Sequence, residues 1–356
     1  MTLRAGSRST ALRESHAVRF FGAASEVFDR ARARVGMREH DLVLAGARIR
    51  LRFAGDALEP LLLPALVHLL TDGVEDEVAL TVSLFDSAST GERMVAPAWG
   101  PDDYGPKGEI VGFNDDRIRT VFQPGVDILN GYDAARRAGL YWVASPRVVP
   151  WWESTFPLRT MLHWWAAPTT LQPVHAGAVG RGGHGVLVAG NSGAGKSTTT
   201  LACLEAGLDY AGDDYVLVDV ESATVHSLYG TAKVEPENLG RFPALAPLVV
   251  NPDRLDAEKA VVLLDDHRAE RLVRSLRLRA VVLPNVTGRR GSTLTAVSPA
   301  AAIRVLAPTT SSHLPGHGRA VVTKLSRLVR ELPCYRLDAG TDLTHLAATV
   351  ASLVEP

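Results

Sequence analysis

The sequence has 356 residues, of which 46% are apolar and 22% are charged, a composition typical of a globular protein with a large buried core. The formal net charge is -1, from 38 Lys and Arg against 39 Asp and Glu, so the chain lacks the basic field that binds nucleic acid by counterion release. A chain of this length exceeds what one hydrophobic core usually supports and predicts two domains.

Cysteine content and hydropathy indicate the compartment. The two cysteines, Cys203 and Cys334, are too few for a disulfide framework or a structural zinc site. The polar and basic N-terminal stretch lacks the apolar core of a secretory signal. The most apolar stretch, residues 58–70, is far shorter than the roughly 20 residues that a membrane span needs. We therefore expect a cytoplasmic protein with neither a membrane nor a nucleic acid as partner.

The first half of the chain predicts a β-rich α+β domain, residues 1–160. Residues 1 to about 15 predict a loose polar tail. The elements expected after it are two strands within 41–53 around Ala45-Gly46, a helix at 57–70, a strand at 78–85, a loop at 96–109, a hairpin at 115–133 around Gln123-Pro124-Gly125 and a strand at 140–144. Trp151 and Trp152 precede Ser154, a helix cap, and the run at residues 156–167, and together they predict a helix that packs the two halves together.

The second half, residues 161–356, predicts an α/β domain. From Pro173 onward, two strands joined by a Gly-rich turn precede a helix, and further strand-like and helical runs alternate to the end of the chain. Such alternation is typical of a mostly parallel sheet covered by helices. The stretch 307–319, rich in Ser, Thr, Gly and Pro, predicts a mobile loop that serves as a lid or as a wall of the acceptor site.

A phosphate-binding motif lies just past the middle of the chain, in the stretch VLVAGNSGAGKSTTT, residues 186–200. An apolar strand precedes the pattern and a helix-compatible run follows it, which is the context that this motif requires. Glycines let the main chain approach phosphate oxygens, and the helix N-terminus attracts the anion. We expect ATP and Mg²⁺ as ligands, with Lys196 on the β and γ phosphates and Ser197 on the cation. The residues expected to line the nucleotide site are Gly190, Asn191, Ser192, Gly193, Ala194, Gly195, Lys196, Ser197 and Thr198.

A kinase also needs a carboxylate that handles the proton of the acceptor hydroxyl. Asp213 and Asp214 follow a short apolar segment one helix after the loop, where a parallel sheet would bring strand ends beside the phosphates. Adjacent side chains on an extended segment point to opposite sides, so one acid could face the metal and the other the acceptor. This pair is favoured over Asp265 and Asp266, which also follow an apolar run.

Residues 175–218, which hold His175, the glycine-rich loop and the two adjacent aspartates, resemble the nucleotide-binding core of the HPr kinase/phosphorylase family. That family shares a fold with phosphoenolpyruvate carboxykinase. The resemblance implies that Asp213 is the base, that His175 is its neighbour, and that Asp214 and Ser197 surround Mg²⁺ while Lys196 binds the phosphates.

The segments SLYGTAKVEPENL and EKAVVLL resemble small kinases encoded with ribosomal peptide clusters, including the lasso-peptide serine kinases. The expected acceptor is therefore a serine of a peptide or protein. For Lys233 and Lys259, a solvated side chain is favoured over a phosphate contact. The Pro-Gly-Arg-Asn loop of the HPr enzymes is absent, so phosphorylase activity, HPr as substrate and a hexamer are not implied.

Several alternatives stay open. The chain could be a regulatory module that binds a nucleotide without transferring phosphate, or a kinase of a small hydroxylated metabolite. The N-terminal domain could capture a peptide by strand addition or could cap the kinase core. A homo-oligomer is also left open.

Overall fold

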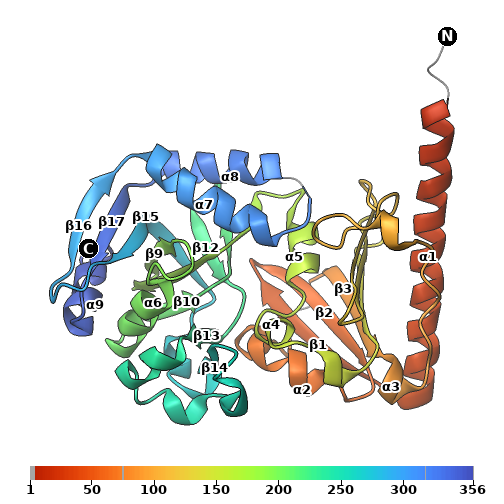
Figure 1. The fold of residues 1–356 in the computed structure, drawn as a ribbon, viewed down its shortest axis with the longest axis horizontal. Coiled ribbons are helices and arrows are strands. Elements are labelled where there is room, and N and C mark those ends of the chain that lie inside the picture. Colours follow the sequence, from red (N-terminus) through yellow and green to blue (C-terminus); the bar gives the residue numbers. More distant parts are fainter. Residues whose placement is uncertain (1–4, 74–75, 317, 356) are drawn as a thin grey trace. The chain divides into compact units, whose positions relative to one another are not determined.

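The computed structural model describes residues 5–73, 76–316 and 318–355, which form a mixed α/β protein of two compact units (Figure 1). The first unit comprises the residues up to Leu63 with Leu70–Pro168 and Leu314–Gly316, and the remainder belongs to the second. The main division lies at Pro168, beyond residue 160, because helix α5, Arg159–Ala166, packs on strand β5, Ile128–Asp133, of the first unit.

A six-stranded sheet in the order β1-β2-β3-β6-β5-β4 forms the first unit. Its other strands are β1 (Met37–Leu44), β2 (Ala47–Ala54), β3 (Val78–Asp86), β4 (Ile118–Gln123) and β6 (Ala138–Val143). The predicted hairpin is present, since β4 pairs with β5. The two strands predicted around Ala45-Gly46 are β1 and β2, which pair across a turn in which both residues have positive φ. Short helices α2 (Glu59–Leu62) and α3 (Ser87–Thr90) lie between strands of this sheet, and α4 (Trp151–Thr155) follows β6.

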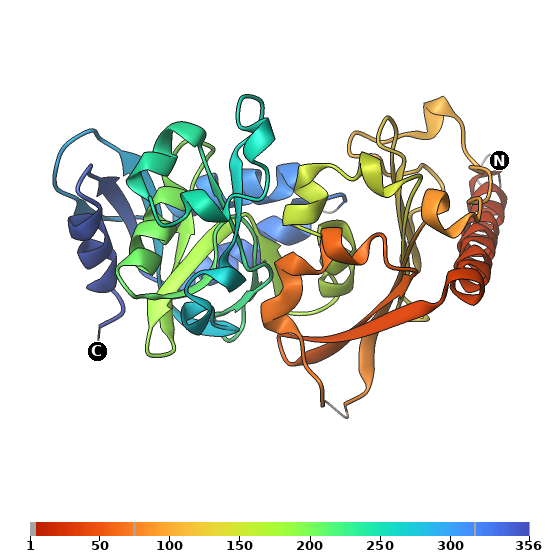
Figure 2. The ribbon, with the colours of Figure 1, turned by 90° about the horizontal axis from the view of Figure 1, so that it is seen from below.

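Helix α1, Ala5–Val35, packs against this sheet (Figures 1 and 2). Phe21, Phe28 and the alanines one turn from them are buried against sheet residues such as Phe85 and Leu140. The predicted loose tail is therefore wrong for residues 5–15, which form the first turns of α1, while residues 1–4 lie outside the described part. The Ala, Arg, Leu and Glu residues of this stretch favour a helix, and the apolar stripe further along fixes it.

Two other helix predictions for this half need correction. The helix expected at 57–70 is broken into α2 and a 3₁₀ turn, Pro64–Leu69, because a proline cannot continue the hydrogen-bond ladder of a preceding helix. The helix expected after Trp151 is two helices, α4 and α5, separated at Leu158, whose φ of 60° is left-handed. Ser154 lies inside α4 and does not cap it.

The edge strand β4 already carries main-chain partners. The Phe122 N–H donates to the Gly108 carbonyl at 2.9 Å, and the Ile110 N–H donates to the Thr120 carbonyl at 3.2 Å. The loop at residues 108–110 thus occupies the positions that an added strand would need. Strand addition at β4 is therefore blocked.

The second unit has a nine-stranded mixed sheet with the main order β10-β8-β9-β15-β12-β11-β7. Its strands are β7 (Leu171–Val174), β8 (Ala176–Arg181), β9 (His184–Ala189), β10 (Asp209–Gly212), β11 (Val216–Asp219), β12 (Thr224–Ser227), β15 (Ser275–Val286), β16 (Thr293–Val297) and β17 (Cys334–Ala339). The prediction of a mostly parallel sheet is wrong, since β15 runs parallel to β9 and β17 and the other pairings are antiparallel. Short turns such as the one between β8 and β9 force antiparallel pairing.

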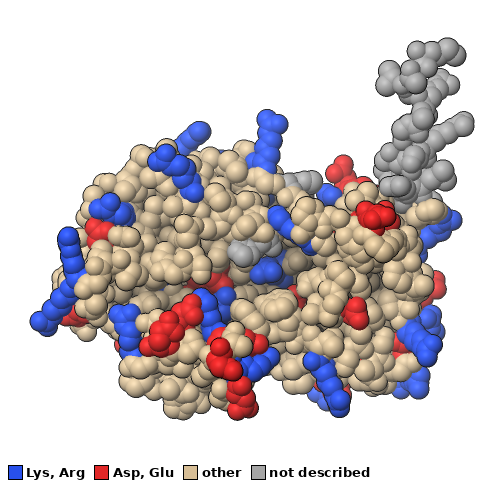
Figure 3. Space-filling model, in the orientation of Figure 1, with Lys and Arg blue, Asp and Glu red and all other residues tan. Residues whose placement is uncertain are grey.

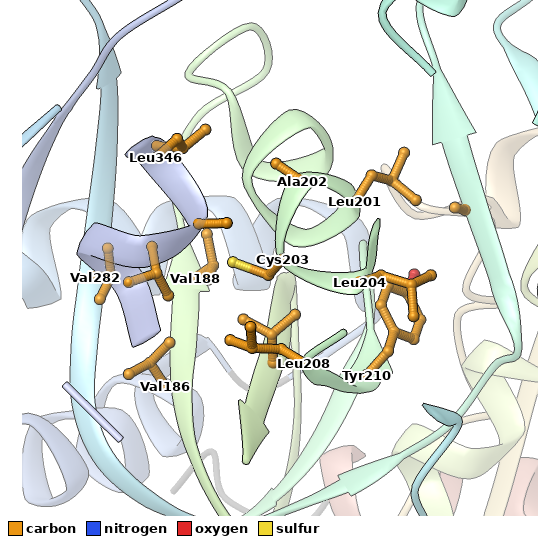
Figure 4. Close-up of a cluster of buried hydrophobic side chains, with 14 of the residues drawn as sticks. Val186, Val188, Leu201, Ala202, Cys203, Leu204, Leu208, Tyr210, Val282 and Leu346 are labelled. Atoms are coloured by element: carbon orange, nitrogen blue, oxygen red, sulfur yellow. The ribbon is translucent and has the colours of Figure 1, made fainter. Parts of the chain in front are cut away.

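Helices cover both faces of this sheet (Figure 1). Helices α6 (Lys196–Glu205) and α9 (Leu343–Ala351) share one core with Val186 and Val188 of β9 and with Val282 of β15 (Figure 4). Helices α7 (Pro299–His313) and α8 (Gly318–Glu331) share the other with Leu187 and Ala189 of β9. Burial on both faces explains why the strand before the loop is a continuous apolar run.

The mobile loop predicted at 307–319 is mostly helical, because α7 continues through Pro308 to residue 313 and α8 starts at Gly318. The Thr309 hydroxyl donates to the Val305 carbonyl at 2.8 Å, and Ser312 bonds within its own turn. Ala302 and Leu306, earlier in α7, are fully buried in the core. Packing thus overrides the weak helix propensity of this stretch, and only the short connection before α8 is irregular.

The remaining bulk features concern cysteines, charge and hydropathy. Both cysteines are buried and form no disulfide. On the face drawn in Figure 3, acidic and basic side chains are interspersed and form no large field of one sign. Among the described helices, none has the length and apolar character needed to cross a membrane.

Candidate functional site

The sheet topology brings His175, the glycine-rich loop and the aspartate pair to the same end of three neighbouring strands. Strand β8 runs antiparallel to β9 and to β10. Ala176 pairs with Ala189, so His175, just before β8, lies at the end of β9 where the glycine-rich loop starts. Gly212 pairs with Ala178, so the two aspartates that follow Gly212 emerge at the same end of the sheet. Residues far apart in the sequence are thereby neighbours.

The glycine-rich loop, residues 190–195, connects β9 to α6. Gly193 and Gly195 have φ of 77° and 100°, in the left-handed region that side chains other than glycine rarely adopt. Asn191, Ser192 and Gly193 are exposed, and Ser197 and Thr198 are half-buried in the first turn of α6. The loop therefore leaves the start of a helix accessible to an anion.

Lys196 is buried beneath this loop. Its Nζ donates to the Gly190 carbonyl at 2.9 Å and lies 3.4 Å from the Asn191 carbonyl. Burial lowers the pKa of Lys196, and the nearby carboxylates of Asp214 and Asp213 only partly offset this effect. An ammonium group held by carbonyl oxygens at the base of the loop is poised to bind a polyanion that supplies full negative charge.

Asp213 is 2% exposed and is joined to α6. Its Oδ1 accepts a hydrogen bond from the Thr200 hydroxyl at 3.0 Å, and its Oδ2 accepts one from the Lys233 N–H at 3.2 Å. Burial and the charge of Asp214 raise the pKa of Asp213, although hydrogen bonds from Lys233, Ser197 and Thr200 oppose this shift. The carboxylate thus lies beside the hydroxyls of the helix that follows the loop.

Asp214 has a different set of neighbours. Its Oδ1 lies 2.7 Å from Nε2 of His175, and its Oδ2 lies 2.5 Å from Nζ of Lys233. An ionised carboxylate only accepts hydrogen bonds, so Nε2 of His175 carries the hydrogen in this contact. Burial alone would raise the pKa of Asp214, but the hydrogen bond from His175 and the charge of Lys233 hold it well below its usual range.

His175 is fixed by contacts on two further sides. Its imidazole stacks on the ring of Tyr215, with centroids 5.1 Å apart and an interplanar angle of 21°. Its main-chain N–H donates to Oγ1 of Thr310, a buried residue of α7, at 3.2 Å. The position of the imidazole is therefore set by the sheet, the neighbouring ring and a helix together.

The predicted partner of His175 needs correction. The family resemblance implies that His175 is the neighbour of Asp213, whereas the structure hydrogen-bonds it to Asp214. After β10 ends at Gly212, successive side chains point to different sides, so Asp213 reaches α6 and Asp214 reaches the start of β8. The sequence offers two adjacent acids but no means of deciding which faces which neighbour.

Lys233 is also placed differently from the favoured expectation of a solvated lysine. It lies on β13 (Thr231–Val234), its side chain is 13% exposed, and its Nζ contacts Asp214. Lys259 is more open and pairs with Glu235 at 2.6 Å. Lys233 reaches the site because β13, which pairs with β14 (Ala260–Leu263), contacts α6, a contact that no local sequence pattern encodes.

Two other residues of the site were not predicted. Thr200 lies one helical turn after Lys196, a spacing that could have identified it, and Tyr215 directly follows the aspartate pair.

The alternative acids do not follow a strand of the large sheet. Asp265 and Asp266 form a 3₁₀ turn after β14, which pairs with β13 in a separate two-stranded sheet.

The donor groups suit a magnesium ion that is shared with a polyphosphate. Within the described residues, no group of three or more His, Cys, Asp or Glu side chains could hold a metal by itself. Mg²⁺ is commonly held by one or two carboxylates together with phosphate and water oxygens. Asp213 fits this role, because its carboxylate interacts with Ser197 and because burial, which raises its pKa, disfavours a charged form that a cation would stabilise.

Comparison with known proteins finds little similarity. No protein-family model matches the chain, and no curated protein matches its sequence. Among solved structures, the Hpr(Ser) kinase/phosphatase from Coxiella burnetii matches with 10% sequence identity over 51% of this chain and 93% of that protein, at a TM-score of 0.25. This is a distant structural relationship.

Proposed function

We propose that the protein is an ATP-dependent, Mg²⁺-assisted phosphotransferase whose acceptor is an alcohol group, the hydroxyl of a serine in a peptide or protein. One observation carries the proposal. Asp213 and Asp214 follow β10 at the sheet edge where the glycine-rich loop follows β9, and the two acids have different partners there. A polyanion site and two differently tuned carboxylates at one edge suit phosphoryl transfer.

The nucleotide phosphates would lie over the loop at the start of α6. Main-chain N–H groups of the loop and the helix dipole attract the phosphate oxygens, and Lys196 exchanges its carbonyl partners for the β and γ phosphates. Ser197 and Asp213 would hold Mg²⁺, which neutralises charge that develops between the β and γ phosphates.

Asp214 is proposed as the base. The acceptor hydroxyl donates a hydrogen bond to Asp214, its oxygen forms a bond to the γ-phosphorus, and the bond from that phosphorus to the bridging oxygen of ADP breaks. The proton passes to Asp214. A carboxylate with a low pKa can do this, because the hydroxyl becomes strongly acidic as the oxygen bonds to phosphorus and catalysis depends mainly on positioning. His175 and Lys233 orient the carboxylate.

These roles reverse the ones that the family resemblance implies, in which Asp213 is the base and Asp214 binds the metal. Asp213 is the acid beside Ser197 and Thr200, and it is almost fully buried. Asp214 is the acid beside His175, and its side chain is 12% exposed. The more accessible acid is the better candidate for contact with an acceptor.

Transfer of γ-labelled phosphate tests the proposal. The full-length protein is incubated with γ-labelled ATP, Mg²⁺ and synthetic peptides encoded beside its gene, each also made with every Ser changed to Ala. Label should enter a Ser-containing peptide and should be lost with the Ala version and with Lys196→Ala. Label in a small metabolite of a cell extract would change the acceptor class. ATP binding without any labelled acceptor would contradict transfer and favour a regulatory module.

A further inference from the structure

A cavity in the first unit takes no part in the chemistry above. Its volume is about 360 Å³. The side chains that form most of its wall are apolar or aromatic: Phe20, Met94, Val95, Trp99, Phe122 and Trp142. This volume lies near the lower end of the range for small-ligand sites, so it suits one bulky side chain or one small ring compound.

The side chains of the wall pack against one another and against the core. All six of these residues are partly exposed and pack against the core between α1 and the sheet. Phe20 meets Trp99 edge to face at a centroid distance of 4.9 Å, and Trp99 lies 6.1 Å from Phe122. A ligand would therefore not have to order these side chains on binding.

The cavity presents ring surface and few free polar groups. The Trp142 indole N–H donates to the Ser87 hydroxyl at 2.9 Å, and the Trp99 indole N–H donates to the Tyr104 hydroxyl at 3.1 Å. The charged residues of the lining, Arg93 and Asp127, are exposed and of opposite sign. An apolar, uncharged group is thus the best match for the cavity.

One wall also offers main-chain hydrogen bonds. Residues 91–97 run without a turn, a bend or any regular element. In the part of the chain that the structure describes, the N–H groups of Arg93, Met94, Val95 and Ala96 have no hydrogen-bond partner. Unpaired main chain beside an apolar cavity is how sheet-like peptide sites combine affinity with side-chain selectivity.

We infer that this cavity binds the aromatic or large aliphatic side chain of a peptide whose main chain pairs with residues 93–96. A free apolar molecule would leave those main-chain groups unused. The inference does not depend on phosphate transfer, since all residues that carry it lie in the first unit. It also differs from strand addition at β4, whose edge the loop at residues 108–110 occupies.

Ligand-observed NMR with the full-length protein tests the inference. The probes are acetyl-Ala-Phe-Ala-amide, acetyl-Ala-Ala-Ala-amide and toluene, which offer ring and main chain, main chain alone and ring alone. We expect the Phe peptide to bind at least roughly tenfold more tightly than toluene, the effect of one or two main-chain hydrogen bonds, and the Ala peptide not to bind. Equal binding of toluene and the Phe peptide would overturn the peptide assignment, and no binding by any probe would overturn the site.

Matched variants locate the binding. Ala96→Trp places a large side chain in the cavity lining and should abolish binding of the Phe peptide, whereas Val148→Trp, at an exposed position outside the lining, should leave it unchanged. Circular dichroism checks that both variants fold. Lys196→Ala should bind the peptide as the unaltered protein does, so loss of transfer and loss of peptide binding are separable. Binding that survives Ala96→Trp would place the ligand elsewhere.

Discussion

Nε2 of His175 lies 2.7 Å from Oδ1 of Asp214, so a residue that precedes β8 is hydrogen-bonded to one that follows β10. The contact exists because β8 runs antiparallel to β10, which brings the start of one strand beside the end of the other. On its far side Asp214 contacts Lys233, whereas Asp213 bonds Thr200. Two neighbouring acids are thereby given different environments, on which the division of roles between them depends.

Asp214→Asn should separate the base from the metal-binding acid. Without a proton acceptor, transfer from ATP should slow by about 10² to 10⁴, while the affinity for nucleotide is largely kept. Asp213→Asn should instead raise the Mg²⁺ concentration needed for half-maximal activity. Both effects are measured by steady-state kinetics over a Mg²⁺ titration.

The exposed acid of the alternative pair provides the control for that experiment. Asp266→Asn should leave both the rate and the Mg²⁺ requirement unchanged. If Asp213→Asn lost the rate at saturating Mg²⁺ while Asp214→Asn did not, the roles implied by the family resemblance would be restored.

Removing the imidazole of His175 should change how activity depends on pH. The hydrogen bond from His175 helps to hold the pKa of Asp214 low. In His175→Ala the pKa of Asp214 rises. As the pH is lowered, the carboxylate therefore becomes protonated, and activity is lost, at a higher pH than in the unaltered protein. The acid limb of the kcat profile should move upward in the Ala variant and return toward its original position in His175→Gln, whose amide can donate to the same oxygen. An acid limb that stays in place in His175→Ala would show that His175 does not act through Asp214.

Local sequence patterns predict the parts of this site that depend on local structure. The run Val186–Ala189 and the glycine spacing after it specify a buried strand, a tight loop and the start of a helix, and the structure has all three. The hairpins of the first half were predictable for the same reason, because turn residues and alternation lie within a few positions of one another.

The features that were missed depend on contacts between distant segments. Residues 5–15 become helical as an extension of a helix that the sheet holds, and the stretch after Ala307 becomes helical because α7 packs on the core. Lys233 reaches Asp214 because β13 contacts α6 and its main chain bonds Asp213. The choice of Asp214 as the partner of His175 depends on strand direction, which no spacing in the sequence encodes.

Gly177→Ala should disrupt the site by crowding the contact between β8 and the residues Thr200 and Asp213. A Cβ at this position would lie 2.6 Å from Cγ2 of Thr200 and 2.9 Å from the carbonyl oxygen of Asp213, so β8 or α6 has to shift. Overpacking of this kind usually costs about 1 to 3 kcal/mol, and here it also displaces the acid beside Ser197. Thermal unfolding should show a lower Tm, and transfer should fall with it. Gly240→Ala, where a Cβ meets nothing within 4 Å, should change neither value.

Replacing the Oγ1 acceptor that holds the main chain of His175 should affect both stability and activity. Thr310→Val removes the acceptor of the His175 N–H and leaves that buried group without its present partner. An unsatisfied buried donor costs about 1 to 3 kcal/mol. Thr310→Ser keeps the oxygen and should retain most of the stability and most of the transfer rate. A Val variant with unchanged Tm and unchanged rate would contradict a role for α7 in positioning His175.

Asp213→Asn should stabilise the protein in the absence of nucleotide while impairing its use of Mg²⁺. Burial raises the pKa of Asp213 in the folded protein above its pKa in the unfolded chain. Protonation of this acid therefore favours folding. The effect is complete below the ordinary aspartate pKa of about 3.9 and is lost as the pH rises through the pKa of the folded protein. At pH 7 the burial of this acid therefore costs folding free energy. The amide avoids that cost while Thr200 and the Lys233 N–H keep partners. The Tm of Asp213→Asn should exceed that of the unaltered protein at pH 7, and the difference should shrink toward pH 4. A lower Tm at pH 7 would mean that the hydrogen bonds to the carboxylate outweigh the cost of burying its charge.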